Sequence, residues 1–240
     1  MTMRADLPAW QSAALGLVTD LQGVFGDRLR SVVAYGPHIE GHAATPLTCL
    51  ALVSSLGLSD LEACARQSAR WHRNRIATPL VLSDTELRTS LDAFPLEYGE
   101  IIRAHQRVFG SDPFDGVAIA PADLRRACEA QIKSHLVHLR EGFIEAGGNP
   151  SNIASLVAES SRGFTALLRH VAWLSGGTSR ERVEATREGA RAAGITDGIV
   201  ADMLALEHQP AMRTTDPARL FPDYVAAVEQ LARAVDAWRV

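Results

Sequence analysis

The sequence changes character at Pro121, and this change restricts the fold more than any other feature of the chain. Before Pro121, short apolar runs of strand length alternate with segments that have helical spacing. After Pro121, apolar residues recur at intervals of three and four residues, which is typical of packed helices. We therefore predict an α+β fold, with a small mixed sheet and its helices over residues 1–118 and an all-helical bundle over residues 119–240.

The first part contains three short apolar runs that predict strands. They span residues 29–35, 47–53 and 79–82. A fourth strand is predicted over residues 94–98, where Pro95 restricts it to a sheet edge or a bulge. Helices are expected over residues 7–25, 60–72 and 83–91. Ser59 is the expected cap of the second of these helices. Ser83 and Glu86 have the spacing of a capping box at the start of the third.

The second part consists of helical segments separated by turns rich in glycine and proline. The expected helices span residues 124–143, 151–174, 182–193, 197–206 and 221–238. Ser151 is the expected cap of the second of these helices. His135 lies close to the apolar stripe of the first, so we expect a hydrogen-bonded core or interface histidine rather than a metal ligand.

Two of the predicted strands are joined by a loop that contains Gly36 and Gly41, within the stretch from Val32 to Ser54. Glycine allows another group to approach the backbone closely, at little conformational cost. No Asp or Glu occurs from Gly41 to Ser59. The loop therefore contains two glycines, and the strand that follows it contains no carboxylate.

Over residues 32–53 this outline resembles the start of a polymerase-β-type nucleotidyltransferase domain. In that family the loop reads Gly-Ser followed by a second Gly, and its backbone N–H groups face the nucleotide phosphates. Gly36 and Gly41 match the glycines, whereas Pro37 stands where serine is expected and removes one N–H donor. The resemblance implies a nucleotidyltransferase-like sheet and a weak nucleotide-binding loop formed by Gly36, Pro37, His38 and Gly41. The helical second half also suits this family, whose catalytic domain is often followed by a helical one.

The family's next strand carries an Asp-x-Asp pair that holds magnesium, and this sequence lacks the pair. Without a gap the pair falls at Thr48 and Leu50, and after a shift of one residue it falls at Leu47 and Cys49. None of these side chains offers the carboxylate oxygens that Mg²⁺ requires. The resemblance therefore implies a degenerate member, for which we predict no catalytic residue, no metal ligand and no magnesium cofactor.

Two other sets of polar residues are candidate replacements for the missing pair. The family's third carboxylate comes from a later strand, where Asp92 and Glu97 are the only counterparts, but one carboxylate cannot build a two-metal site. His38, Glu40 and His42 form a polar cluster in the loop that could bind a transition metal or serve acid–base chemistry. Their spacing matches no specific motif.

Residues 71–75 form a basic segment with one aromatic side chain. Arginine suits phosphate oxygens, so this segment could contact a phosphate or an RNA backbone. The segment also ends a predicted helix, where the helix dipole favours cations. We interpret it as an ordinary helix terminus.

Composition argues against several classes of partner and location. The net charge of −4 gives no reason to expect strong binding to nucleic acid or to an anionic membrane, and no apolar run is long enough for a membrane span. Cys49, Cys64 and Cys128 match neither a disulfide framework nor a zinc site. Because no signal-peptide pattern is present, the expected location is the cytoplasm.

Two classes of function follow from these observations. The favoured hypothesis is a non-catalytic nucleotidyltransferase-like protein that acts as a nucleotide- or ligand-binding scaffold or as a partner-binding scaffold. The alternative is a divergent nucleotidyltransferase that transfers a nucleoside monophosphate to a small molecule or a protein. The expected partners are a nucleotide or small molecule, together with a protein or a second copy bound through the helical domain. Nucleic acid is not an expected partner.

Overall fold

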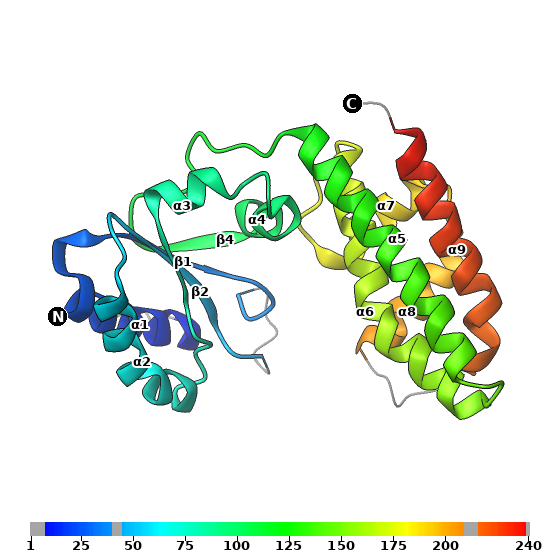
Figure 1. The fold of residues 1–240 in the computed structure, drawn as a ribbon, viewed down its shortest axis with the longest axis horizontal. Helices are drawn as coiled ribbons and strands as arrows, with labels where there is room; N and C mark the ends of the chain where they lie inside the picture. Colours follow the sequence, from blue (N-terminus) through cyan, green and yellow to red (C-terminus); the bar gives the residue numbers. More distant parts are fainter. Residues whose placement is uncertain (1–7, 40–44, 209–215, 239–240) are drawn as a thin grey trace. The chain divides into compact units, whose positions relative to one another are not determined.

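The computed structural model describes residues 8–39, 45–208 and 216–238, and Figure 1 shows their course. The chain divides into two compact units, Met1–Ile119 and Ala120–Val240. The described residues of the first unit combine a sheet with helices, and those of the second form helices and their connections. The α+β fold class is therefore confirmed, and the division falls one residue after the predicted position.

The sheet of the first unit contains four strands in the described part of the chain. They are β1 (Leu29–Tyr35), β2 (Thr48–Val53), β3 (Leu80–Ser83) and β4 (His105–Gly110). Their order across the sheet is β3-β2-β1-β4. β1 is antiparallel to both of its neighbours, whereas β2 and β3 are parallel. β2 is a continuous apolar run after Thr48, and β1 is apolar except for Arg30 and Ser31. Such runs are typical of strands that are covered on both faces.

Helices lie on both faces of this sheet (Figure 1). α1 (Ala9–Phe25) and α2 (Leu58–Arg73) pack on one face, in a core cluster that includes Val32 and Ala34 of β1 and Cys49 and Ala51 of β2. α3 (Asp84–Thr89) and α4 (Pro95–Arg103) belong to the connection between β3 and β4, which are the two edge strands. That connection crosses the sheet on the face that α1 and α2 leave uncovered, as Figure 1 shows.

The prediction of a strand over residues 94–98 was wrong, because these residues begin α4. Pro95 lies in the first turn of the helix, where the missing N–H group leaves no hydrogen bond unmade. Tyr98 and Ile101 are buried on one side of α4, and the Tyr98 hydroxyl lies 2.8 Å from Oγ of Ser90. The edge strand is instead β4, whose first residue is His105.

One of the three predicted helix caps is confirmed. The prediction of Ser59 as a cap was wrong, since α2 includes Ser59 and its N-cap is Gly57. Ser83 Oγ accepts a hydrogen bond from the Glu86 backbone N–H at 3.2 Å, and the Glu86 carboxylate accepts one from the Ser83 N–H at 2.7 Å. The prediction of Ser151 as a cap was wrong, since Asn149 caps α6 (Pro150–Leu174). The Asn149 side-chain oxygen accepts a hydrogen bond from the Ser151 N–H at 2.9 Å.

The second unit is a helical bundle centred on α6. Its other helices are α5 (Pro121–Glu145), α7 (Arg182–Ala192), α8 (Asp197–His208) and α9 (Pro217–Ala237), and α6 packs against all four. Phe164 and Tyr224 are fully buried, with ring centroids 5.2 Å apart. His135 Nε2 lies 2.7 Å from the Tyr224 hydroxyl, which confirms His135 as a hydrogen-bonded core histidine, and burial lowers the pKa of its imidazole. No helix among the described residues has both the length and the apolar character needed to cross a membrane.

Candidate functional site

The glycine loop begins with a tight turn at Gly36, directly after β1. Gly36 has a φ angle of 80°, in the left-handed region, and its carbonyl oxygen accepts a hydrogen bond from the Ile39 N–H at 3.2 Å. A Cβ atom on Gly36 would lie 2.9 Å from Oγ1 of Thr48. Both the backbone conformation and the available space therefore require glycine at this position.

His38 forms a hydrogen bond to the segment that leads into β2. Its Nδ1 atom donates a hydrogen bond to the Thr45 carbonyl oxygen at 2.6 Å, and the side chain is half-buried. The structure thus brings three of the four predicted nucleotide-binding residues, Gly36, Pro37 and His38, into one turn. Gly41 lies outside the described residues, and so do Glu40 and His42 of the predicted polar cluster.

The positions implied for the metal-binding pair carry side chains with other contacts. Thr48 Oγ1 donates a hydrogen bond to the Tyr35 carbonyl oxygen at 2.5 Å. Leu50 is the cross-strand partner of Val33, and its side chain is 0% exposed. In the shifted register Cys49 is buried, and burial raises the pKa of its thiol to about 12, so that the thiolate needed for metal binding does not form near neutral pH. The residues at both registers therefore do not fit a magnesium ion.

Asp92 and Glu97 do not supply a third carboxylate on a strand of the sheet. Asp92 lies in the turn between α3 and α4, and Glu97 lies in the first turn of α4. Both residues are exposed. Throughout the described part of the chain, no group of three or more His, Cys, Asp or Glu residues is placed so that it could hold a metal ion.

A row of polar residues crosses three strands beside the Gly36 turn. Thr48 of β2 and His105 of β4 are both cross-strand partners of Tyr35, so the three side chains lie on the same face of the sheet. His105 Nε2 lies 3.1 Å from the Asp112 carboxylate, and its Nδ1 lies 2.9 Å from the Ile101 carbonyl oxygen. Burial raises the pKa of the Tyr35 hydroxyl.

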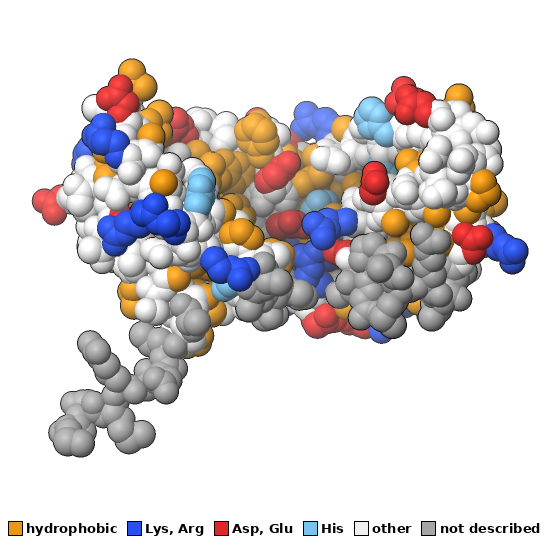
Figure 2. Space-filling model, turned by 90° about the horizontal axis from the view of Figure 1, so that it is seen from below, with side chains coloured by type: hydrophobic (Ala, Val, Ile, Leu, Met, Phe, Trp, Pro, Cys, Tyr) orange, Lys and Arg blue, Asp and Glu red, His pale blue; other side chains and the backbone are white. Residues whose placement is uncertain are grey.

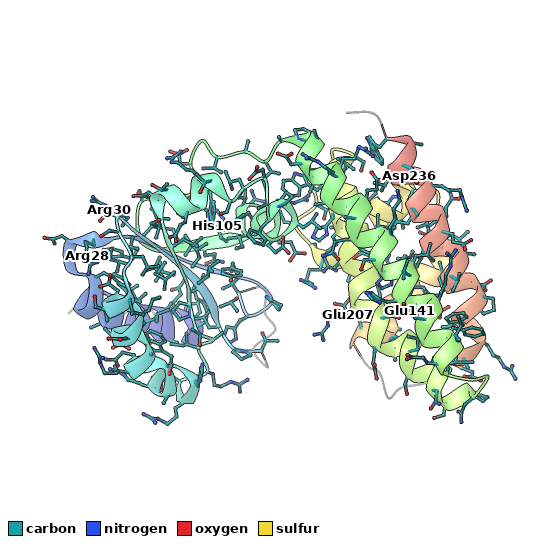
Figure 3. All side chains as sticks on the ribbon, in the orientation of Figure 1. Arg28, Arg30, His105, Glu141, Glu207 and Asp236 are labelled. Carbon is teal, nitrogen blue, oxygen red and sulfur yellow. The ribbon has the colours of Figure 1, made fainter. Side chains whose placement is uncertain are left out.

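Figure 3 shows His105 on the sheet, whereas Arg28 and Arg30 lie at the opposite end of β1 from the glycine loop. The sequence alone does not reveal this row, because the pairing of His105 with Tyr35 depends on β4, a strand that was not predicted. Both ring nitrogens of His105 and the hydroxyl proton of Thr48 are used in hydrogen bonds within the protein, so the Tyr35 hydroxyl is the group of this row that suits a hydrogen bond to a ligand rather than coordination of a hard cation.

Comparison with solved structures identifies the fold. No protein-family model matches the sequence, and a search of curated proteins finds no match. The crystal structure of the spectinomycin adenyltransferase AAD(9) from Enterococcus faecialis, with ATP and spectinomycin, superposes with a TM-score of 0.56. The chain has a nucleotidyltransferase fold. The match has 11% sequence identity and covers 94% of this chain and 98% of that chain, so the likeness extends over both the sheet and the helices.

Proposed function

We propose that this chain is a non-catalytic protein with a nucleotidyltransferase fold. Its α/β unit acts as a nucleotide- or ligand-binding scaffold, and its helical unit binds a partner or a ligand. The observation that carries the proposal is the side chain of Leu50, which is 0% exposed at a position where the fold's usual chemistry needs a metal-binding carboxylate.

Nucleotidyl transfer depends on metal ions because negative charge on the reacting phosphate must be neutralised. Thr48, the other position of the pair, has its hydroxyl group bonded to the Tyr35 carbonyl oxygen. The chain therefore lacks the means to stabilise that charge with a metal at this place. A non-catalytic role accounts for this without requiring a second, unseen site.

The Gly36 turn supports binding of a nucleotide without a metal ion. The half-buried turn lies next to Tyr35, whose hydroxyl group can bond to a ligand beside the row that Thr48 and His105 complete. Pro37 supplies no N–H group, so fewer donors are available to phosphate oxygens than in a Gly-Ser loop. The expected affinity is therefore low.

A divergent nucleotidyltransferase is the second candidate. The likeness to an adenyltransferase over 94% of the chain favours it, because both the sheet and the helices correspond. Such an enzyme would transfer a nucleoside monophosphate to a small molecule or a protein. Its carboxylates would have to come from residues other than Thr48 and Leu50.

Thermal unfolding with ATP, GTP or CTP, each in EDTA and in Mg²⁺, distinguishes the two candidates. We expect at least one nucleotide to raise the melting temperature by the same amount with and without Mg²⁺. A ligand at ten times its Kd stabilises the folded state by about 1.4 kcal/mol, which is a shift of a few degrees. His38→Ala, which removes the bond to Thr45, is expected to reduce the shift.

The matched control is His138→Ala, since His138 is an exposed histidine on α5 whose only described partner is Glu141. This control should keep the full nucleotide shift. A shift that appears only with Mg²⁺ would favour the divergent enzyme. No shift with any of the three nucleotides would contradict the proposal that the α/β unit binds a nucleotide.

A further inference from the structure

The exposed side of α2 carries a row of arginines. Arg66, Arg70 and Arg73 are all exposed, and their spacing of four and three residues places them on one face of the helix. The row is about 10 Å long, from the rise of 1.5 Å per residue. In Figure 2, which views the molecule from below, blue side chains lie over the part of the surface that α2 forms.

Among the described residues, only the middle arginine of the row forms an ion pair. Arg70 forms an ion pair with Asp20 of α1 at 2.9 Å, and Asp20 also accepts a hydrogen bond from the Trp71 indole N–H at 3.0 Å. The Asp20 side chain is only 8% exposed, so its negative charge interacts with Arg70 and Trp71 rather than with solvent. Arg66 and Arg73 take part in no ion pair with any residue that the structure describes.

The helix dipole explains only part of this row. Favourable interaction between a cation and the helix C-terminus is limited to the last turn, which here includes Arg70 and Arg73. Arg66 lies about two turns before the end of α2, and like charges four residues apart destabilise a helix. The helix-terminus interpretation was made for residues 71–75, so of this row it applies only to Arg73.

The neighbouring exposed face of α1 carries no charge. Its exposed residues are Ser12, Leu15, Gly16, Thr19, Gln22 and Gly23. Leu15 is 46% exposed, and no atom lies within 4 Å of the positions where Cβ atoms of Gly16 or Gly23 would be. The Asp20–Arg70 ion pair joins this face to the arginine row. Together the α1 face and the row form one surface, which we call the α1–α2 surface.

We propose that the α1–α2 surface binds an acidic segment of a partner protein. Carboxylates of that segment would pair with Arg66, Arg70 and Arg73, because guanidinium groups bind carboxylates with two parallel hydrogen bonds. Its small and apolar side chains would contact the uncharged α1 face around Leu15. This proposal does not depend on the proposed function of the glycine loop.

The surface suits a protein segment better than a nucleic acid. Trp71, the aromatic residue of α2, is 1% exposed and cannot stack on a base. The chain as a whole has a net charge of −4, which repels a long polyanion, whereas a short acidic segment contacts only the local positive charge.

Fluorescence anisotropy with the full-length protein tests this proposal. The probe is a labelled helical peptide of about 15 residues, with glutamates at three successive turns and leucines on the adjacent stripe. We expect the peptide to bind, its all-glutamine version not to bind, and added salt to weaken binding. Arg66→Glu combined with Arg73→Glu should raise the Kd at least tenfold, and the corresponding glutamine pair should raise it by a smaller factor without reversing charge.

The matched control is Arg88→Glu combined with Arg187→Glu, two exposed arginines on α3 and α7 that change the net charge equally. This control should leave the Kd within twofold. Equal weakening by both double variants, or no binding of the glutamate peptide, would overturn the proposal. Tighter binding of a labelled DNA duplex, lost in the Arg66/Arg73 variant, would overturn it in favour of a phosphate backbone.

Discussion

Leu50 stands where the resemblance to nucleotidyltransferases implies a metal-binding carboxylate. It is 0% exposed and pairs across the sheet with Val33, which is equally buried. A carboxylate there would be a buried charge without a partner. We predict that Leu50→Asp lowers the free energy of unfolding by about 3–5 kcal/mol, measured by urea denaturation near neutral pH.

Leu50→Met is the control for this substitution, because it preserves side-chain volume and should cost less than about 1.5 kcal/mol. Adding Mg²⁺ should not restore the stability of Leu50→Asp. If that variant were as stable as the wild type, or became so only with Mg²⁺, then position 50 could hold a metal-binding carboxylate, contrary to our proposal.

Gly36 illustrates a residue whose role follows from its conformation. Its φ angle of 80° is costly for any residue with a Cβ atom, and that atom would also crowd Thr48 Oγ1. We predict that Gly36→Ala destabilises the protein by about 1–2 kcal/mol. Gly16→Ala, in the exposed middle of α1 with open space around it, should instead stabilise by about 0.5–1 kcal/mol. Equal effects of the two substitutions on the urea midpoint would refute the account of the turn.

At the scale of elements, an ion pair joins the segment before β1 to the first turn of α2. Arg28 donates hydrogen bonds to the two Asp60 carboxylate oxygens at 2.7 and 2.8 Å. Hydrogen bonding to Arg28 lowers the pKa of Asp60 from 3.8 to about 2. Because the folded-state pKa lies below the unfolded value, the stabilisation is complete above pH 4 and is lost as the pH falls through 2.

We therefore predict that the urea midpoint of the wild type falls more steeply between pH 5 and pH 2 than that of Asp60→Asn. Asp27→Asn, an exposed carboxyl in the preceding 3₁₀ turn, serves as the control and should retain the wild-type slope. Parallel pH profiles for the wild type and Asp60→Asn would mean that the ion pair does not contribute to acid stability.

Elements that are buried on both faces or have regular helical spacing were predictable from the sequence. The central strands β1 and β2 are apolar almost throughout, and α5, α6 and α9 have long amphipathic patterns. β4 was missed because it is an edge strand whose side chains are partly or fully exposed. The stretch that begins α4 was misjudged because a short apolar run containing proline fits either an edge strand or the first turn of a helix.

The candidate site was predictable only where it depends on local sequence. The need for glycine at position 36 and the lack of carboxylates in β2 are visible in the sequence. The pairing of Tyr35 with His105 is not, because these residues are distant in the chain and meet through the register of β1 and β4.

At the scale of the whole molecule, the chain shares its fold with an adenyltransferase, whereas the absence of that fold's metal chemistry is our proposal. The likeness covers 94% of the chain at 11% identity, a level at which packing is shared but individual side chains differ. A fold alone does not determine an activity, which depends on the residues placed at the site. The positions that the sequence resemblance implies for a metal-binding pair carry a hydrogen-bonded threonine and a buried leucine.

The central claim is that Mg²⁺ plays no part in ligand binding by the α/β unit. Isothermal titration of ATP into the full-length protein, in EDTA and in excess Mg²⁺, tests it most directly. We predict Kd values that agree within about twofold, since no carboxylate pair is available to bind the metal. A Kd at least tenfold lower in Mg²⁺ would contradict the claim and indicate a metal-dependent nucleotidyltransferase.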